Sequence, residues 1–315
     1  MKKYLFLVLA AIAIIAISGC TQRSTTIDAN NGLKINEFSA DPLEAESNDL
    51  VSFLLEVENV GGTTAKDVVA NLYGVQNQWI DTNNNVVDST LTKEIGTLKP
   101  PDITRNIPGD FKMVQWTLRA PRMPEGTNQI LPITARITYI YNTTGSIVIK
   151  AFSDQQQKIE QNLKKWPPAN PFVVTNTNAP IKIDVPTRYQ IPIIVDTTKP
   201  DDQTEQLRIE FVNKGNGWPV TENVPGRMYG TIRLFGPAEF SDCLGVTSGN
   251  EIGIDENNVD LVKLKSTGNV PVACEIKINK DQWGNNPEGI ITMTFEMYYL
   301  YYLEQTAPVR VIGIA

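Results

Sequence analysis

The sequence predicts an all-β protein made of two tandem Ig-like antiparallel β-sandwiches joined by a short helix. Short segments rich in β-branched and aromatic residues recur along the chain, bounded by Gly, Pro, Asn or Asp, and are typical of strands. One pattern of such segments occurs twice. At 315 residues the chain is also long enough to bury two separate cores.

The first element is a hydrophobic leader. Lys2 and Lys3 precede a 14-residue apolar run that ends at Ile17, and Ser18-Gly19-Cys20 follows. This order is typical of a secretory signal, and its last four residues form a lipobox-like Ile-Ser-Gly-Cys. A membrane-spanning helix needs about 20 apolar residues, so a lipoprotein signal is favoured over a short anchor or an ordinary cleaved signal. We predict a signal peptide at 1–19, a lipid on Cys20 that anchors the chain outside the cytoplasm, and a polar tether at 20–32.

The repeated pattern defines two domains. Each copy opens with an apolar strand that ends in Asn-x-Gly, at Asn59 and at Asn213, and the offset between matching segments stays between 154 and 163 residues. The glycine suits a reversal of the chain, and the asparagine side chain can hold the turn. Each copy closes with an aromatic-rich strand, a turn expected at 142–145 or 304–306, and a returning strand. The predicted domains are 33–153 and 181–315, each an antiparallel sandwich.

A helical connector and linker are expected at 154–180. Ser153 and Gln156 form a capping box, and Pro167 ends the helical segment. Ile159, Leu163 and Trp166 share one face, which predicts packing against a sandwich, with a membrane-surface role as the alternative. The rest of the linker, from residue 169 to 180, is expected to be irregular.

The segment from Val57 to Tyr73, with its Asn-Val-Gly-Gly turn and the alternating strand after it, resembles the cell-adhesion-related bacterial domain (CARDB). It is also similar to the S-layer-associated Ig-like domains of archaeal surface proteins. The second copy departs from this pattern by inserting Trp218-Pro219 and a longer loop. The resemblance implies a surface-exposed recognition or spacer module without catalysis. The leader and the acidic balance suit an archaeon or a Gram-positive bacterium.

Composition argues against several functions. The chain has no histidine, which removes the commonest general base and metal ligand, and no nucleophile motif is present. We therefore predict no enzyme, no cofactor and no metal site. The net charge of −7 disfavours nucleic acid as a binding partner. The acidic loops 81–88 and 255–260 could bind calcium weakly, but solvated hairpin loops are expected. The first begins like an EF-hand loop, yet Val86 stands at the glycine position and Thr92 at the glutamate position.

The remaining candidate residues concern the second domain and one turn. With Cys20 acylated, Cys243 and Cys274 form an even pair for which we expect a disulfide, two buried thiols being the alternative. In the run Tyr298-Tyr299-Leu300-Tyr301-Tyr302, alternation sends Tyr299 and Tyr301 to one face and Tyr298 and Tyr302 to the other, so one face is core and the other is a recognition surface or an interdomain contact. Asn142 begins the sequon Asn-Thr-Thr in an expected hairpin turn, where glycosylation is possible.

Together these features predict a membrane-anchored extracytoplasmic lipoprotein that serves as a structural, adhesive or protein-binding module of the cell envelope. Its expected partners are the membrane, through Cys20, and envelope proteins or glycans. Two alternatives stay open: a surface lipoprotein that binds carbohydrate or peptide, and a subunit of a surface filament or S-layer-linked assembly whose sheet edges accept strands from neighbours.

Overall fold

The computed structural model describes residues 26–265 and 267–314, so the predicted leader and Cys20 lie outside the described residues. The α-helices of the described part are short, at α2 (Asp154–Asn162) and α3 (Lys280–Trp283), and single 3-10 turns lie at Thr187–Tyr189 and Val259–Leu261. In chain order the strands are β1 (Leu33–Asp41), β2 (Glu44–Glu46), β3 (Leu50–Asn59), β4 (Ala65–Tyr73), β5 (Leu91–Leu98), β6 (Phe111–Arg119), β7 (Asn128–Ser153), β8 (Phe172–Asn176), β9 (Ile181–Asp184), β10 (Ile193–Val195), β11 (Gln203–Asn213), β12 (Trp218–Thr221), β13 (Val224–Pro225), β14 (Tyr229–Phe235), β15 (Ala238–Cys243), β16 (Glu251–Ile254), β17 (Asn269–Ile278) and β18 (Glu288–Ile312). Among these residues no helix is long and apolar enough to cross a membrane.

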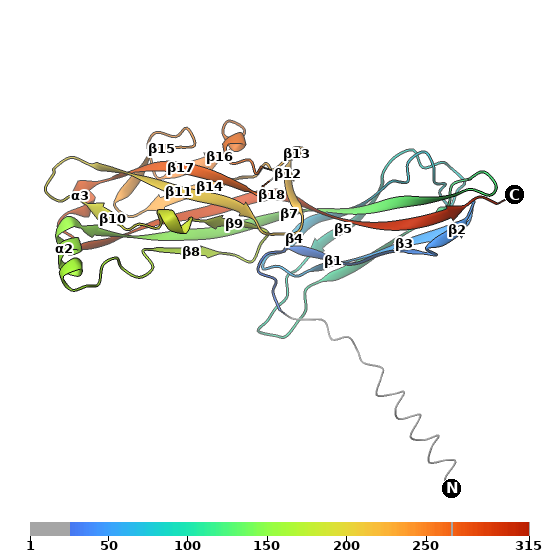
Figure 1. Ribbon diagram of the computed structural model, residues 1–315, viewed down its shortest axis with the longest axis horizontal. Coiled ribbons are helices and arrows are strands. Elements are labelled where there is room, and N and C mark those ends of the chain that lie inside the picture. The colour runs from blue at the N-terminus through green and yellow to red at the C-terminus, as the bar shows by residue number, and fades with distance from the viewer. Residues whose placement is uncertain (1–25, 266, 315) are drawn as a thin grey trace, which may run out of the picture.

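The strands form an elongated body with two lobes that lie end to end along its long axis (Figure 1). Lobe 1 contains a three-stranded sheet of β1, β3 and β6, and lobe 2 contains a four-stranded sheet of β9, β11, β15 and β17. An 11-stranded sheet forms the second layer of both lobes. Nearly all pairings are antiparallel, which confirms the predicted all-β fold of antiparallel sandwiches.

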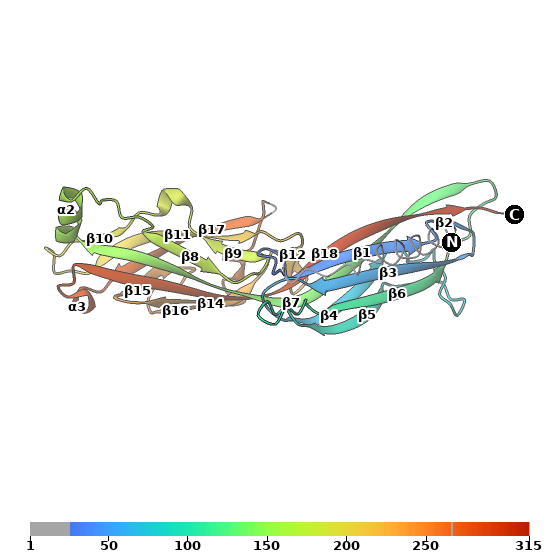
Figure 2. The ribbon, with the colours of Figure 1, turned by 90° about the horizontal axis from the view of Figure 1, so that it is seen from below.

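The lobes share two strands. All 25 residues of β18 pair with β7 in one uninterrupted antiparallel ladder that runs through both lobes (Figure 2). The first half of β7 pairs with β4 in lobe 1, and its second half pairs with β8 in lobe 2. The first half of β18 pairs with β14 in lobe 2, and its last residues pair with β2 in lobe 1. Each repeat therefore supplies a strand to the other repeat's sandwich.

The expected hairpin turns at 142–145 and 304–306 are therefore wrong. Both segments are extended and lie inside the β7–β18 ladder, where Asn142 pairs with Tyr298 and Thr306 pairs with Thr134. Asn, Thr and Gly tolerate extended backbone as well as a turn, and here the long ladder supplies cross-strand partners for every residue. The returning strand of each predicted hairpin exists, but it lies in the other lobe.

The strand exchange also changes the expected domain organisation. Residues 145–152 belong to lobe 2, and residues 303–312 belong to lobe 1, so the predicted boundaries at 153 and 181 do not separate the two lobes. Helix α2 does not join the lobes, because it lies at the far end of lobe 2 (Figure 1). The expected irregular linker contains β8, which pairs with β7. The connection between the lobes is the pair of continuous strands.

Helix α2 begins as predicted but does not pack as predicted. The Ser153 hydroxyl accepts a hydrogen bond from the Gln156 backbone N–H (3.1 Å), as expected for an N-cap. No helical residue is buried, and Ile159 and Leu163 are half exposed. Trp166, beyond the helix, supplies the contact instead by an edge-to-face arrangement with Phe152, with ring centroids 5.5 Å apart. The apolar face formed by Ile159 and Leu163 is too short to reach the core.

The core lies on one face of the shared ladder along its whole length. Odd-numbered residues of β7 from Leu131 to Ala151, apart from Gly145, are buried, and so are the odd-numbered residues of β18 from Ile291 to Val311, apart from Gln305. Because side chains alternate along a strand, both smaller sheets cover the same face of the long sheet. The even-numbered residues form its outer face, which stays uncovered from one lobe to the other.

The segment before β1 is packed between the lobes. The Asp28 backbone N–H donates to the Val60 carbonyl (2.7 Å), and the Asn31 side chain accepts from the Asn216 backbone N–H (3.1 Å). These contacts connect the turn of the first repeat with that of the second. From Asp28 onward, the chain is therefore not the free tether that was expected at 20–32.

Candidate functional site

Cys243 and Cys274 lie side by side on β15 and β17 in lobe 2. They are paired across the two strands and joined by a disulfide with an S–S distance of 1.98 Å, and both residues are buried. Cys20, the predicted lipidation site, lies outside the described residues. The disulfide closes a 31-residue segment that contains β16 and so restrains one edge of lobe 2.

Two of the four predicted recognition tyrosines are core residues. Tyr299 is 3% exposed and Tyr301 is fully buried. They form an edge-to-face cluster with Tyr139 and Tyr141 of β7, with ring centroids 5.6 to 6.0 Å apart. Burial raises the pKa of Tyr299 and of Tyr301 well above the ordinary value. These two residues pack in the core at the centre of the molecule and are not available for a ligand.

The buried tyrosines hold the Asn-x-Gly turns that the repeat analysis singled out. The Tyr141 hydroxyl accepts from the Thr63 backbone N–H, and the Tyr301 hydroxyl accepts from the Gly217 backbone N–H, both at 3.1 Å. Tyr301 also donates to the side chain of Asn213 (2.8 Å). The two turns thus have equivalent hydrogen bonds.

Glycine is required where these tyrosines approach the turns. A Cβ atom at Gly61 would collide with the Tyr141 hydroxyl, and a Cβ atom at Gly215 would lie 2.5 Å from the Tyr301 hydroxyl. Since such contacts are shorter than van der Waals separation, the turn and the tyrosine could not both keep their positions. The Asn-x-Gly motif therefore serves the fold rather than a ligand.

Tyr298 and Asn142 face each other on the outer face at the middle of the ladder. Tyr298 is 43% exposed and also pairs with Tyr229 of β14. A hydrogen bond to Glu296 is the main cause that raises the pKa of Tyr298. Asn142 is half-buried in the interior of a central strand, so the expected setting of its sequon in a hairpin turn is wrong.

Carboxylates of the acidic loops form hydrogen bonds and ion pairs with other residues of the chain. The Asp81 carboxylate accepts from the backbone N–H groups of Asn83 and Asn85 (both 2.8 Å), and these hydrogen bonds lower its pKa although partial desolvation opposes them. In the other loop, Asp260 forms an ion pair with Arg227 (2.8 Å). Within the described residues no group of three or more His, Cys, Asp and Glu side chains could hold a metal ion.

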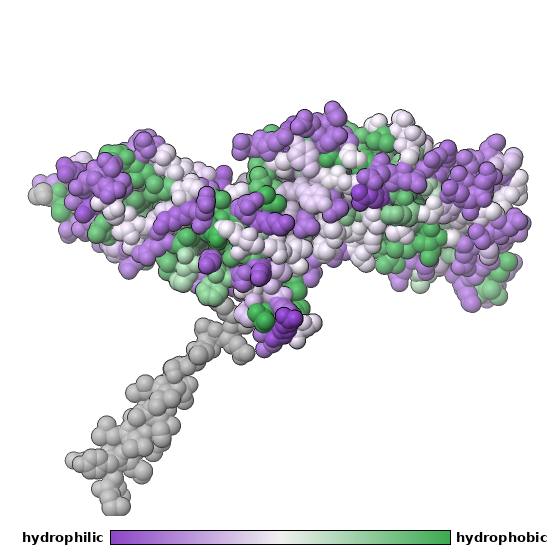
Figure 3. Space-filling model, turned by 180° about the vertical axis from the view of Figure 1, so that it is seen from behind, coloured by the Kyte–Doolittle hydropathy of each residue, from purple (hydrophilic) through white to green (hydrophobic). Residues whose placement is uncertain are grey.

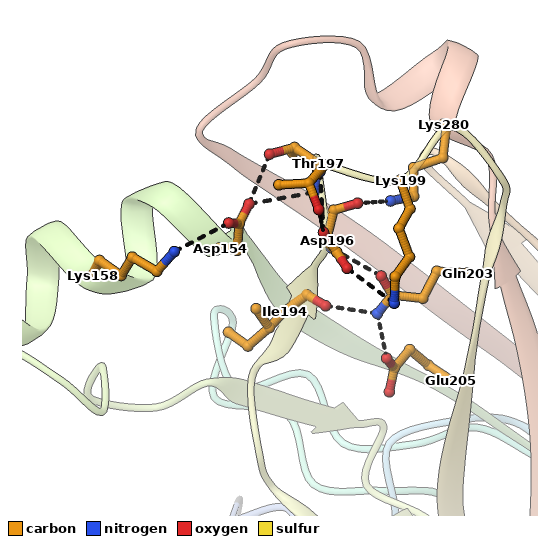
Figure 4. A network of polar contacts seen from close by, with 10 residues as sticks. Asp154, Lys158, Ile194, Asp196, Thr197, Lys199, Gln203, Glu205 and Lys280 are labelled. Atoms are coloured by element: carbon orange, nitrogen blue, oxygen red, sulfur yellow. Dashed lines mark hydrogen bonds and ion pairs between the residues drawn. The ribbon is translucent and has the colours of Figure 1, made fainter.

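A polar network occupies the free end of lobe 2 (Figure 4). Asp154 at the start of α2 accepts from the Thr197 hydroxyl (2.7 Å) and pairs with Lys158 (3.5 Å). Asp196 accepts from the hydroxyl of Thr198 (2.6 Å), which is the largest of the causes that lower the pKa of Asp196 to about 2. Because Asp154 on α2 bonds to Thr197, the network fastens α2 to the loop before β11.

Tyr302, the fourth predicted recognition residue, lies in a groove on the outer face of lobe 1, next to the junction with lobe 2. The groove has a volume of 580 Å³, and its floor is made by neighbouring strands β4, β7 and β18. We call it the tyrosine groove, after Tyr73 and Tyr302, which flank the Arg136 side chain. The Arg136 guanidinium carbon lies 5.0 Å from the Tyr73 ring centre and 4.7 Å from the Tyr302 ring centre. These distances are typical of cation–π contacts.

Arg136 is held in place by charge as well as by the rings. It forms an ion pair with Glu304, its cross-strand partner, with an N–O distance of 2.6 Å. Partial burial lowers the pKa of Arg136, but the hydrogen bond and the charge of Glu304 outweigh this and raise it above the ordinary value. Glu304 therefore neutralises the charge of the guanidinium, and the guanidinium packs against the two tyrosine rings.

One wall of the groove comes from the insertion that distinguishes the second repeat. The strands β12 and β13 form a hairpin beside β18, with Trp218 opposite Tyr302 and Val220 opposite Leu300. Val220, Asn223 and Pro225 of this hairpin line the groove. Sequence reasoning recognised the insertion at Trp218-Pro219 but missed the groove, because its walls come from segments far apart in the chain.

Lobe 2 has a counterpart on the same outer face, which we call the threonine groove. It has a volume of 570 Å³ and lies over β7, β14 and β18, with Thr144, Thr231 and Thr294 among its lining residues. Arg233 lines it and pairs with Glu251 (2.9 Å). Its lining contains no tyrosine and no inserted hairpin. Seen from behind, the surface of both lobes carries small hydrophobic patches interspersed among hydrophilic residues (Figure 3).

No family model matches the chain, and no curated protein matches it. The solved structures that share limited similarity include three proteins. The major pilin subunit of Bacillus cereus, BcpA, is 10% identical with a TM-score of 0.24, over 76% of this chain and 55% of the pilin. Red sea bream transglutaminase is 11% identical with a TM-score of 0.19, over 90% of this chain and 32% of that one. The DNA glycosylase AlkC of Pseudomonas fluorescens is 6% identical with a TM-score of 0.20, over 34% of this chain and 27% of that one. The chain thus spans about half or less of each of these proteins, and such TM-scores carry no argument about function.

Proposed function

We propose that this protein is an extracytoplasmic, lipid-anchored and non-catalytic module that acts as a stiff spacer and recognition element of the cell envelope. The observation that carries the proposal is the β7–β18 ladder, in which all 25 residues of β18 are paired across both lobes. Two sandwiches linked by a flexible peptide would move independently, whereas two strands that pass through both cores resist bending between the lobes. A stiff elongated body can hold a recognition surface at a distance from a membrane.

The placement at the membrane is supported by the leader. The lipobox-like residues before Cys20 follow a charged start and an apolar run, and acyl chains bury many methylenes at about 0.8 kcal/mol each. The disulfide between Cys243 and Cys274 suits an oxidising compartment. A lipid anchor would leave the outer face of the long sheet free to contact envelope proteins or glycans.

Intact mass of the full chain extracted from membranes tests this proposal. The expected mass is that of residues 20–315 plus lipid, and a Cys20→Ala variant is expected to lose the lipid and leave the membrane fraction. A Thr21→Ala variant is the matched control and should keep both. An uncleaved chain, or a mature chain without lipid, would contradict the proposal.

A second candidate function, a filament subunit, is favoured by the strand exchange. The last residues of β18 pair with β2 in lobe 1, although β18 begins in lobe 2, so the same strand could be taken from a neighbouring copy. Thr134 and Thr306 are directly opposite across the ladder, with hydroxyls 2.9 Å apart. A Thr134→Cys/Thr306→Cys variant oxidised on intact cells is expected to give disulfide-linked ladders if the strand comes from a neighbour. A cross-link confined to single chains would exclude this function.

A further inference from the structure

The tyrosine groove contains polar groups that the chain leaves without partners. In the described part of the chain, the hydroxyls of Tyr73, Thr138 and Tyr302 make no hydrogen bond to protein atoms, and the Asp67 carboxylate and the Asn223 amide make none either. By contrast, Arg136 contacts Glu304 through its Nε and Nη2 atoms. The groove therefore presents hydrogen-bond donors and acceptors that are free for a bound molecule.

The charges of the groove limit the class of ligand. Among the described residues that line it, Asp67 is the one unpaired charged group, since Arg136 is neutralised by Glu304. An anionic ligand would meet the Asp67 carboxylate without a free cation to balance it, which is unfavourable. A cationic ligand would meet only one carboxylate at an exposed site, where an ion pair contributes little. The electrostatics favour a neutral ligand.

Apolar side chains lie between the polar ones. Val69 of β4, Leu300 of β18 and Pro225 of the inserted hairpin line the same groove as the free hydroxyls. A molecule that matches this surface needs apolar C–H faces and many hydroxyl groups. Sugars have both properties, because a pyranose ring presents C–H groups on its faces and hydroxyls around its rim. The volume of 580 Å³ also falls within the range of about 300 to 1,000 Å³ that is usual for small-ligand clefts.

We propose that the tyrosine groove binds a neutral oligosaccharide, with the free hydroxyls, Asp67 and Asn223 bonding its hydroxyl groups. The threonine groove is the natural comparison, because it lies on the same outer face with a similar volume but without tyrosines or the inserted hairpin. The insertion of β12 and β13 in the second repeat is thus the feature that converts one of two related grooves into a ligand site. This inference rests on the proposed envelope function and names its ligand class.

Calorimetric titration of the full chain with mannohexaose, cellohexaose and chitohexaose tests the proposal. At least one of these neutral hexasaccharides is expected to bind saturably at millimolar concentration or below, a weak affinity that suits an open groove. Asp67→Gly and Asn223→Gly remove exposed side chains at two positions of positive φ, which glycine adopts without strain, and are expected to weaken binding by about tenfold each without loss of folding. Thr294→Ala, in the threonine groove, is the matched control and should leave the affinity unchanged.

Three outcomes would overturn the proposal. One is the absence of saturable binding to any of the three probes at about 10 mM, a concentration that would reveal even a millimolar Kd. Another is binding that Thr294→Ala weakens and Asp67→Gly does not. The third is binding of an extended peptide, but of no sugar, at the same groove. The result is independent of the membrane test, because titration uses purified protein: a lipidated chain that binds no sugar overturns only this inference, and an unlipidated chain overturns only the proposed anchoring.

Discussion

A substitution in the core of lobe 2 is predicted to destabilise lobe 1 by the same amount. Phe211 of β11 is fully buried and packs edge to face against Phe295 of β18, with ring centroids 6.0 Å apart. Replacing a buried Phe by Ala costs about 3 to 5 kcal/mol, because apolar contacts are lost and a cavity remains. Since β18 continues into lobe 1, unfolding of lobe 2 removes a strand from lobe 1 as well. We therefore expect the two lobes to open together.

Hydrogen exchange measured by mass spectrometry checks this coupling. Peptides from β3 report on lobe 1 alone, because among the described strands β3 pairs only with β1 and β6. A loss of about 3 to 5 kcal/mol corresponds to exchange roughly 10² to 10⁴ times faster for the slowest β3 amides in Phe211→Ala. Ile159→Ala on the exposed face of α2 is the control and should leave β3 unchanged. Faster exchange in β11 and β17, with β3 protected as in the parent chain, would refute the argument.

Three further predictions concern the turns, the disulfide and the tip of lobe 2. Gly215→Ala is expected to lower the unfolding free energy by about 1 to 3 kcal/mol in urea denaturation, because its Cβ would meet a buried tyrosine hydroxyl, while Gly253→Ala, whose Cβ meets nothing within 4 Å, should change it far less. Replacing Cys243 and Cys274 together by Ser is expected to lower it by about 3 to 4 kcal/mol, since the disulfide closes a 31-residue segment; an unchanged urea midpoint would contradict this. The folded-state pKa of Asp196 is lowered to about 2, below its ordinary 3.8, so its hydrogen bonds stabilise the fold above pH 3.8 and are lost as the pH falls toward 2. The Tm should therefore fall less between pH 4 and pH 2 in Asp196→Asn than in the parent chain, and equal decreases would disprove the role of this carboxyl.

Much of the fold follows from local sequence. The β-branched segments became strands, and the two Asn-x-Gly motifs became equivalent turns, because alternation and turn preference act over a few residues. The N-cap at Ser153 was predictable for the same reason. In the tyrosine run, alternation separated Tyr299 and Tyr301 from Tyr298 and Tyr302 correctly. It could not indicate which pair was buried, because that depends on which face the smaller sheets cover.

The strand exchange could not be predicted in this way. Asn142-Thr143-Thr144-Gly145 is compatible with a turn and with an extended strand, and the choice depends on pairing with residues about 150 positions further along the chain. The tyrosine groove was missed for a related reason. Tyr73, Arg136 and Tyr302 are distant in sequence and meet only because β4, β7 and β18 are neighbours in the same sheet. Long-range pairing decided both features, and single-sequence patterns carry no information about it.

The shared ladder also constrains how this gene can change. In most tandem arrays, recombination can delete a repeat and leave a folded neighbour, because each repeat contains all of its own strands. Here, loss of the second repeat would remove β18 from lobe 1, and loss of the first would remove β7 from lobe 2. We expect the two copies to be inherited as a pair and to diverge only in their loops. The hairpin of β12 and β13 is such a change, and it lies where an insertion leaves the ladder intact.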